Sequence, residues 1–355
     1  MEIKIGNITI SDKGKPCFIA DIASNHDGKL ERAFKLIELA KEAGADIVKF
    51  QNFKAKKIVS KKAFDNMPKQ THQSSWKKSV YEVYDAASVE DEWTIKLKEK
   101  CNEVGIEYMT SPYDFESVDL ADKFSNAFKI GSGDITWTRM LNYIAEKNKP
   151  ILLATGASTA EDVDRAVSTI MKKNNQLILM QCNTNYTINR DNFKYINLNV
   201  INTYKAKYSN LILGLSDHTP GHTTVLGAFA LGARVFEKHF TDDNSREGPD
   251  HKFAMNPKTW KDMVEECTNL YYAMGDGVKK VEKNEEDTRI VQQRSFYYQT
   301  NLKKGTIVTE KDIFPVRPIQ KGGYLPYEEN QIVGKKLIRD VEKDSCVMKG
   351  DFSID

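Results

Sequence analysis

The chain has 355 residues, of which 40% are hydrophobic and 29% charged, and its formal net charge at pH 7 is +2. This length fits one barrel-sized domain followed by a small one, and the mixed charges argue against nucleic acid or an anionic membrane as a partner. Five scattered cysteines without a CxxC pair argue against a disulfide framework and a structural zinc site. No segment approaches the roughly 20 apolar residues of a membrane span, and the N-terminus lacks an apolar signal core. We therefore expect a cytoplasmic protein with no nucleic-acid or membrane partner.

Short apolar runs alternate with longer segments of helical period from Cys17 onward. Near-continuous apolarity is typical of strands that are buried on both faces. The segments between the runs place apolar residues at i, i+3 and i+4 and end at a glycine, such as Gly44 or Gly105, where helices commonly stop. This repeat of βα units predicts an α/β fold, a TIM (β/α)8 barrel, over residues 1–275. The predicted strands are 17–22, 46–50, 106–110, 127–131, 151–155, 177–181, 211–215 and 234–238.

Two further stretches depart from the repeat. Residues 55–90 are rich in lysine and serine, and so long an excursion favours a loop that folds over the barrel mouth. A solvated insertion without a role is the alternative. After Gly275 a charged linker is predicted at 276–287, followed by a small β-rich domain of short alternating strands at 288–355. A domain of this size holds only a modest core, so we expect it to dock on another surface.

Two histidines end neighbouring predicted strands, His218 in Ser216-Asp217-His218 and His239 in Lys238-His239. A crossover helix between two strands makes them parallel, so both imidazoles leave the same edge of the sheet. In a barrel that edge carries the active site, and neutral imidazoles suit a transition-metal dication. The pair therefore predicts a metal site. The alternative is one core histidine and one surface histidine without function.

Other polar residues also gather at the predicted strand ends, which converge on one pocket in a barrel. Lys49 and Lys129 stand out because lysine is rarely buried without a partner. With serine hydroxyls nearby, two ammonium groups suit a substrate that carries phosphate and carboxylate. Together with a metal, this set indicates a phosphoenolpyruvate enzyme. The strand-end residues are Asp21, Asn25, His26, Lys49, Gln51, Ser111, Lys129, Ser132, Asp134, Thr155, Asn183, Tyr186, Ser216, Asp217, His218, Lys238 and His239.

Motifs along nearly the whole chain resemble those of the sialic acid synthase family. These enzymes condense phosphoenolpyruvate with an N-acetylated amino sugar to give a nine-carbon 2-keto-3-deoxy acid. The resemblance implies a TIM barrel joined to a C-terminal antifreeze-like (SAF) domain, which residues 294–318 resemble. The barrel motifs are DIASNHDG (21–28), VKFQ (48–51), TSPYD (110–114), KIGSGD (129–134), ATGAS (154–158), GLSDHTPG (214–221), EKHFTDD (237–243) and GPDHKF (248–253).

The resemblance also implies roles for individual residues. His218 and His239 match two Mn²⁺ ligands, with Mg²⁺ or Co²⁺ as alternative ions, and Asp21 matches a catalytic carboxylate. Arg317 matches an arginine that the SAF domain sends into the partner subunit's barrel, which implies a domain-swapped homodimer. The positions implied for phosphoenolpyruvate are Lys49, Ser111, Lys129, Ser132 and Ser216, and those for the sugar are Gln51, Asp134, Tyr186, Asp250 and Arg317.

Several positions depart from the family pattern. Asp21-Ile22-Ala23 stands where many members have Glu-Ile-Gly, so the candidate carboxylate is one methylene shorter. Asp134 replaces a common glutamate, Ala154 replaces a frequent serine, and Ser75 lies near the place of a sugar-binding asparagine. These changes cluster on the sugar side, so they bear on the identity of the acceptor more than on the reaction type.

The predicted reaction begins when C3 of phosphoenolpyruvate attacks the aldehyde of the open-chain sugar, which a metal polarises. Water then captures the cationic centre at C2, with Asp21 as base or electrostatic stabiliser, and phosphate leaves when the tetrahedral adduct collapses. The predicted acceptor is N-acetylmannosamine or a related 2-acetamido hexose. A 2,4-diacetamido-trideoxy hexose, leading to legionaminic or pseudaminic acid, is the alternative. A phosphate-dependent TIM-barrel aldolase and a non-catalytic carbohydrate-binding protein are the competing hypotheses.

Overall fold

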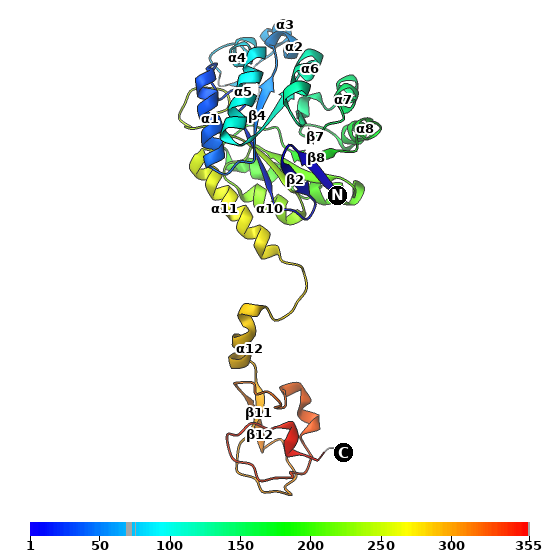
Figure 1. Cartoon of the computed structure of the whole chain (residues 1–355), viewed down its shortest axis with the longest axis vertical. Coiled ribbons are helices and arrows are strands. Elements are labelled where there is room, and N and C mark those ends of the chain that lie inside the picture. Colours follow the sequence, from blue (N-terminus) through cyan, green and yellow to red (C-terminus); the bar gives the residue numbers. More distant parts are fainter. Residues whose placement is uncertain (69–72, 75, 354–355) are drawn as a thin grey trace. The chain divides into compact units, whose positions relative to one another are not determined.

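The computed structural model describes residues 1–68, 73–74 and 76–353, and it divides into two compact units, Met1–Gly275 and Asp276–Asp355. In the first unit, parallel strands close into a barrel in the order β10-β3-β4-β5-β6-β7-β8-β9. Helices surround this barrel (Figure 1), and the predicted TIM barrel is confirmed. The barrel strands are β3 (Cys17–Asp21), β4 (Ile47–Asn52), β5 (Glu107–Pro112), β6 (Phe128–Ile130), β7 (Ile151–Ala154), β8 (Leu177–Cys182), β9 (Ile212–Asp217) and β10 (Val235–His239).

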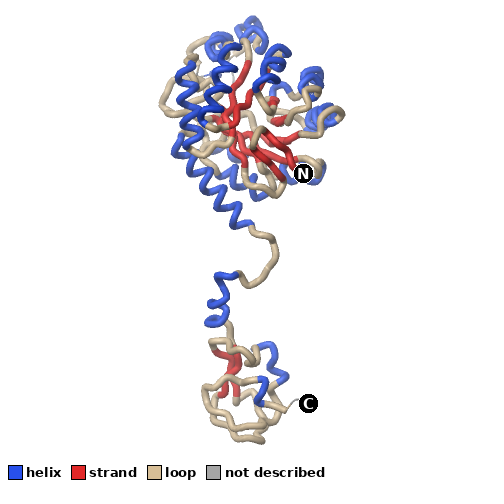
Figure 2. Tube along the Cα trace, viewed as in Figure 1, coloured by secondary structure: helices blue, strands red, loops and turns tan. Residues whose placement is uncertain are grey.

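Local signals in the sequence set where the outer helices begin and end. Thr159 and Asp162 form a capping box at the start of α8, and Gly105 ends α5 in a left-handed conformation with φ of 75°. Figure 2 shows the helices as an outer layer around the strands. The helices that cover the barrel are α1 (Leu30–Glu42), α5 (Asp91–Val104), α6 (Phe115–Phe124), α7 (Thr138–Ala145), α8 (Ala160–Met171), α9 (Val200–Lys207), α10 (Thr223–Leu231) and α11 (Pro257–Met274).

Alternate residues along each barrel strand face opposite sides of the wall. Phe18 and Val48 face outward and belong to the large core beneath the helices. Ile19 and Ile47 face inward and belong to a second core that fills the lumen. The near-continuous apolar runs of the sequence therefore serve two cores at once.

An N-terminal hairpin adds to the core of the lumen. Strands β1 (Glu2–Ile5) and β2 (Ile8–Ser11) pair antiparallel, and Ile3, Ile5 and Ile10 pack with the inward side chains of the barrel. The hairpin is absent from the elements predicted above because each strand has only four residues, too few for a clear alternation.

The excursion before the third barrel strand is partly helical, with α2 (Ala55–Ile58), α3 (Lys61–Asp65) and α4 (Val80–Ala87). Its helices share a small apolar cluster of their own. A capping box between Ser79 and Glu82 starts α4. Ser75, singled out from the sequence, lies outside the described residues.

In the second unit, α12 (Glu286–Gln292) begins inside the stretch predicted as linker. Strand β11 (Ser295–Tyr298) pairs antiparallel with β12 (Ile313–Val316). The expected series of alternating strands is reduced here to this pair and to isolated bridges such as Leu302–Val341. Short 3-10 turns, Pro326–Gln331 among them, interrupt the rest, yet the unit keeps a compact core of its own.

Two expectations about the whole chain can be compared with the structure. The five cysteines are free and buried, in agreement with the absence of a disulfide framework. Within the part of the chain that the structure describes, no helix combines the length and apolarity needed to cross a membrane.

Candidate active site

The carboxyl ends of the barrel strands surround a cavity of about 330 Å³. Along each strand, inward positions recur every two residues, so the column that holds Ile47 continues to Lys49, and the column that holds Val235 continues to Glu237. All the site residues predicted within the first unit line this cavity. They are Asp21, Lys49, Gln51, Ser111, Lys129, Ser132, Asp134, Tyr186, Ser216, His218, His239 and Asp250.

Two buried lysines and two buried carboxylates form the floor of the cavity. Nζ of Lys129 lies 2.7 Å from Oε1 of Glu237. Because β6 and β10 stand opposite each other in the ring of strands, this ion pair spans the lumen. Nζ of Lys49 lies 2.8 Å from Oδ2 of Asp21 and 3.4 Å from Oε1 of Glu237. The floor is therefore one connected network of opposite charges.

The charges of this network support one another. Burial alone would lower the pKa of Lys49, but the negative charges of Asp21 and Glu237 outweigh that effect and raise it. Burial alone would raise the pKa of Glu237, but Lys129 and Lys49 lower it to about 2. Both groups are thus charged at neutral pH although solvent hardly reaches them.

Glu237 lines the cavity, but the sequence pattern does not predict it as a site residue. It lies inside the apolar run 234–238, which the sequence predicts as a strand. A usable signal was present, because a residue two positions before His239 shares its side of the strand. Oε2 of Glu237 has no hydrogen-bond partner among the described residues, so this carboxylate still has an acceptor to offer.

Three serines line the cavity, and two of them lie beside the lysines. The hydroxyl of Ser111 lies 3.5 Å from Nζ of Lys49, and that of Ser216 lies 3.5 Å from Nζ of Lys129. The hydroxyl of Ser132 accepts a 2.9 Å hydrogen bond from the backbone N–H of Gly156. A Cβ at Gly156 would lie 2.9 Å from that hydroxyl, so glycine allows this close approach.

The two histidines lie side by side, with ring centroids 5.4 Å apart. Nδ1 of His218 lies 2.8 Å from the carbonyl oxygen of Asn183, which can only accept, so Nδ1 carries the proton and Nε2 keeps a lone pair. Burial, reinforced by His239, lowers the pKa of His218 to about 3, which keeps the ring neutral. This is the form that binds metal ions.

His239 completes the pair. Its Nε2 lies 3.8 Å from Oδ2 of Asp21, and its buried Nδ1 has no hydrogen-bond partner among the described residues. The two imidazoles fit a metal, although no group of three or more histidine, cysteine, aspartate or glutamate side chains in the described chain could hold one. An ion bound here would therefore take its remaining ligands from water or substrate.

The upper part of the cavity combines polar and aromatic groups. Nε2 of Gln51 donates to Oδ2 of Asp21 over 3.1 Å. The Tyr186 ring lies 4.3 Å from the His218 ring, centroid to centroid. Burial raises the pKa of Asp134 to about 6. Aromatic and aliphatic side chains of the excursion form one wall: Ile58, Trp76, Val83, Tyr84 and Ala87. The excursion therefore contributes to the cavity, as the first of its two interpretations predicts.

Not every strand-end residue enters the cavity, and the expectation that all converge on one pocket is wrong for Asp217 and Lys238. These two are absent from its described lining because strand alternation turns them to the outer side of the wall. There they form a sealed ion pair, with Nζ of Lys238 2.7 Å from the carbonyl oxygen of Thr219 and Asp217 accepting from Thr224 over 2.7 Å. Asn25, His26, Thr155 and Asn183 are likewise absent from the described lining.

Arg317 follows β12 in the second unit and is exposed. It is not among the residues that the barrel itself brings together.

Comparisons with known proteins agree with this architecture. The NeuB family model matches residues 36–279, and the SAF domain model matches residues 293–353. The N,N'-diacetyllegionaminic acid synthase of Campylobacter jejuni is 35% identical, over 94% of this chain and 99% of its own. The pseudaminic acid synthase of the same species is 32% identical, over 99% of this chain and 100% of its own. Human N-acetylneuraminate-9-phosphate synthase is 29% identical, over 94% of this chain and 92% of its own.

Solved structures extend the likeness to the fold. The spore coat polysaccharide biosynthesis protein SpsE of Bacillus subtilis is 30% identical with a TM-score of 0.67, covering 100% of both chains. The N-acetylneuraminic acid synthetase of Leptospira borgpetersenii, in complex with citrate, is 27% identical with a TM-score of 0.72, covering 81% of this chain and 95% of its own. The chain therefore belongs to the NeuB family and carries a C-terminal SAF domain, as its motifs predict.

Proposed function

We propose that the protein is a synthase that condenses phosphoenolpyruvate with an N-acetylated amino sugar and water, releasing phosphate and a nine-carbon 2-keto-3-deoxy acid. The observation that carries this proposal is the convergence of two buried lysines, three serines and two histidines on one cavity. The names of the relatives, which are legionaminic, pseudaminic and N-acetylneuraminate-9-phosphate synthases, agree with the reaction class predicted from the sequence.

Phosphoenolpyruvate would occupy the floor, on Lys49 and Lys129 with Ser111, Ser132 and Ser216. The ammonium groups of both lysines are already desolvated and paired with carboxylates. When phosphoenolpyruvate binds, these ammonium groups would exchange their carboxylate partners for the anionic groups of the substrate. Such an exchange avoids the large cost of bringing an isolated lysine out of water at the moment of binding.

His218 and His239 would hold Mn²⁺, with Mg²⁺ or Co²⁺ as alternatives. When bound, the ion supplies Lewis-acid polarisation of the sugar aldehyde. The chain's own contribution is orientation, since the Asn183 carbonyl fixes the His218 tautomer and the Tyr186 ring packs against it.

Asp21 is the proposed base or electrostatic stabiliser at the cationic centre. Its Oδ2 faces Lys49 and Gln51, while its Oδ1 accepts a 3.0 Å hydrogen bond from the backbone N–H of Ala23. Ala23 has a left-handed φ of 46°, which turns the chain back onto this carboxylate. The shorter side chain of aspartate is thus held by its own loop.

The sugar would lie against Gln51, Asp134, Tyr186 and Asp250. The apolar wall of the cavity favours the 2,4-diacetamido-trideoxy acceptor, which carries a methyl group and a second acetyl group where N-acetylmannosamine has hydroxyls.

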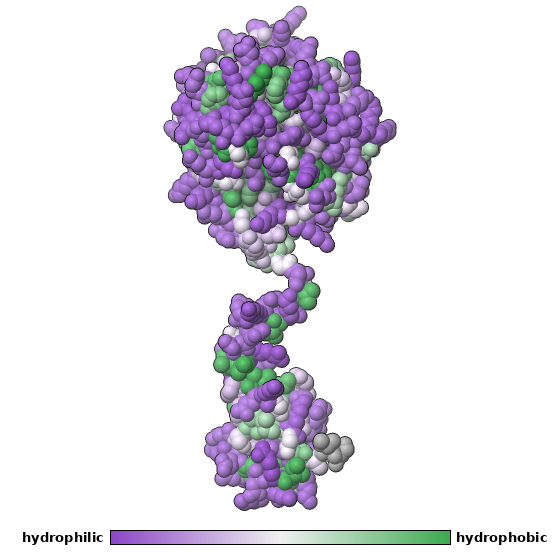
Figure 3. All heavy atoms as spheres, viewed as in Figure 1, coloured by the Kyte–Doolittle hydropathy of each residue, from purple (hydrophilic) through white to green (hydrophobic). Residues whose placement is uncertain are grey.

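The protein is further proposed to be a cytoplasmic homodimer in which Arg317 enters the partner subunit's barrel. Exposed apolar side chains along the linker and α12 support an association, since Val278, Ile290 and Val291 are 63%, 52% and 56% exposed. Figure 3 shows hydrophobic atoms on the surface of this segment. Buried free cysteines support a reducing compartment.

The function is tested by incubating the protein with phosphoenolpyruvate, Mn²⁺ and either N-acetylmannosamine or the diacetamido-trideoxy hexose. We expect phosphate release and a nine-carbon acid by mass spectrometry, faster with the second sugar. No product with any acceptor in a panel of such sugars would refute the synthase. Borohydride trapping of substrate on Lys49 or Lys129 would instead indicate an aldolase.

The subunit arrangement is tested by mixing inactive His218→Ala protein with inactive Arg317→Ala protein. After subunit exchange, a mixed dimer holds one site with an intact barrel and an intact arginine, so up to about half of the native activity per mixed dimer should return. Exchange without recovery would rule out a shared site.

A further inference from the structure

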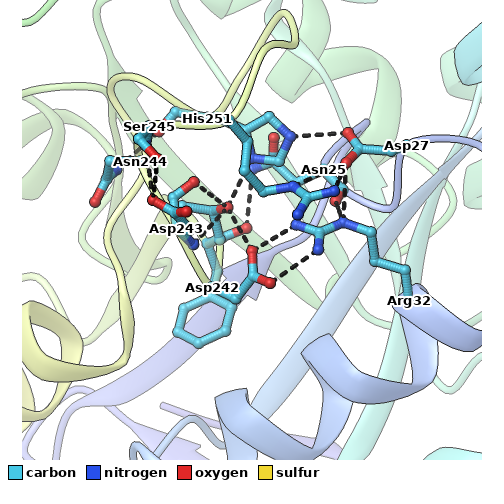
Figure 4. A network of polar contacts seen from close by, with 11 residues as sticks. Asn25, Asp27, Arg32, Asp242, Asp243, Asn244, Ser245 and His251 are labelled. Atoms are coloured by element: carbon cyan, nitrogen blue, oxygen red, sulfur yellow. Dashed lines mark hydrogen bonds and ion pairs between the residues drawn. The ribbon is translucent and has the colours of Figure 1, made fainter.

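Two loops at the barrel mouth are joined by a polar network beside the cavity (Figure 4). One loop, residues 22–29, follows β3, and the other, residues 240–256, follows β10. At the centre, Nε2 of the fully buried His251 lies 2.8 Å from Oδ1 of Asp27. Nδ1 of the same ring lies 2.7 Å from the hydroxyl of Thr241. Both ring nitrogens are therefore engaged, and the imidazole has one orientation.

Asp27 receives several donors at once. Arg246 donates to Oδ2 through Nε at 3.1 Å and Nη2 at 2.8 Å, and Nε of Arg32 lies 3.0 Å from the same oxygen. Burial alone would raise the pKa of Asp27, but the hydrogen bonds from His251 and Arg246 outweigh it and lower it to about 2. Arg32 also donates from Nη1 to Asp242 over 2.8 Å, so α1 is tied to both loops.

The second loop passes tightly over the imidazole. A Cβ at Gly248 would lie 2.6 Å from Cδ2 of His251. This contact is too close for any side chain, so the loop needs glycine at this position. Between these two residues stand Pro249 and Asp250, which line the cavity. The backbone N–H of Ser24, on the first loop, lies 3.3 Å from Oδ2 of Asp250. His251 thus anchors the loop on one side, while its neighbour Asp250 faces the cavity on the other.

We propose that the Asp27–His251 pair is a positioning device that holds residues 248–251 so that Asp250 presents its carboxylate to the acceptor sugar. The inference rests on the proposed function, because it gives a structural basis to a residue assigned there to the sugar. Neither Asp27 nor His251 is among the described residues that line the active-site cavity, although Asp27 lines a neighbouring cavity together with Ser24 and Pro249. We therefore expect the pair to act on the phosphoenolpyruvate subsite less than on the sugar side.

The test uses Asp27→Asn, which keeps the shape of the side chain and removes its charge. Asparagine tolerates the left-handed φ of 52° at this position, so the variant should fold. The sugar KM should rise by about 10-fold, as expected for the loss of a charge-assisted hydrogen bond. The phosphoenolpyruvate KM and the kcat per active site should stay within about twofold of the wild-type values, because the residues proposed to bind phosphoenolpyruvate and the metal are unchanged.

Asp164→Asn is the matched control, because Asp164 on α8 also pairs with a cation, Lys207 at 2.5 Å, and is not among the described residues that line the active-site cavity. It should leave both KM values unchanged. Amide hydrogen exchange gives a readout that needs no substrate, and residues 240–256 should exchange faster in Asp27→Asn and at the native rate in Asp164→Asn.

Equal rises in both KM values, or an unchanged sugar KM together with unchanged exchange, would overturn the positioning role while leaving the synthase intact. If the wild-type protein condenses no sugar at all, the proposed function fails first. Hydrogen exchange then still decides whether the pair holds the loop, and unchanged exchange in Asp27→Asn refutes it.

Discussion

The two ends of the barrel use the same strands and bury opposite kinds of side chain. Toward the amino ends, Ile19 and Ile47 pack with Ile5 of the hairpin in a hydrophobic cluster that fills the lumen. Two residues further along the strands, Asp21 and Lys49 are equally buried but charged. Apolar contacts need no partner and hold the fold, whereas each buried charge needs an opposite one. We therefore expect the polar end to serve binding, as proposed above, and the apolar end to serve stability.

A second comparison separates two ion pairs on the same strands. Lys129 and Lys238 are both 2% exposed, and each meets a carboxylate. Lys129 faces the cavity, while Lys238 is sealed behind the wall with Asp217. Only the first can change partners when a ligand arrives. We therefore expect the first pair to govern binding and the second to govern folding.

The largest effect should follow loss of either histidine at the polar end. His218→Ala or His239→Ala should lower metal-dependent phosphate release by at least about 10³-fold, because metal polarisation contributes several kcal/mol. Both histidines face the cavity rather than the hydrophobic core, so the melting temperature should change little. Near-normal activity after chelation and metal add-back would place the metal elsewhere.

The sealed pair should have the largest effect on stability. Lys238→Met leaves Asp217 buried without its cation and should reduce the free energy of unfolding by about 3–4 kcal/mol, measured by urea denaturation. The double variant Asp217→Leu/Lys238→Met removes both charges and should recover much of this loss. If Lys238→Met is as stable as the wild-type protein, the ion pair does not contribute to the stability of the fold.

At the apolar end, Ile5→Ala should lower the free energy of unfolding by about 2–3 kcal/mol, because a fully buried isoleucine leaves a cavity. The kinetic constants should stay at their native values, since the hairpin lies in the core of the lumen rather than in the cavity. An altered phosphoenolpyruvate KM would mean that the two ends are not independent.

The smallest expected effect concerns Asp134, because burial raises the pKa of this carboxyl from its ordinary value of 3.8 to about 6. A carboxyl with a raised folded-state pKa contributes stability below about pH 4 and loses that contribution as the pH rises through about 6. Asp134→Asn should therefore be about 1–2 kcal/mol more stable than the wild-type protein at pH 8 and equal to it near pH 4. Asp262→Asn, at an exposed position on α11, is the control for the removal of one carboxylate.

Much of the fold was predictable because the barrel strands are buried on both faces. Their apolar runs stand out from the helical period around them, and each of the eight predicted runs overlaps a barrel strand. The N-terminal hairpin was not predictable in the same way, because its stability comes from packing Ile3 and Ile5 into a lumen formed by distant residues. The short helices α2 and α3 likewise depend on a cluster shared with α4.

The sequence predicts which strand ends form the candidate site, but it does not predict which residues there face the cavity and which face the outer side of the barrel wall. Successive residues of a strand point to opposite faces of the sheet. An error of one position therefore assigns a residue of the outer core to the cavity, or a cavity residue to the core. The sequence therefore predicts Lys238 as a strand-end residue of the pocket, whereas its neighbour Glu237 is the one that lines the cavity. The Asp27–His251 pair was beyond reach because it joins loops 224 positions apart in the chain.

The most direct test of the account is calorimetric titration of phosphoenolpyruvate, without sugar, into the wild-type protein and the Lys129→Met and Lys238→Met variants. The two lysines are equally buried and equally paired, and they differ in the side of the wall that they face. We predict that Lys129→Met weakens binding by about 10- to 100-fold, as expected for a charge-assisted contact, while folded Lys238→Met binds within about twofold of the wild-type protein. An unchanged dissociation constant in Lys129→Met, or equal weakening in both variants, would contradict the assignment of the charged floor as the anion site.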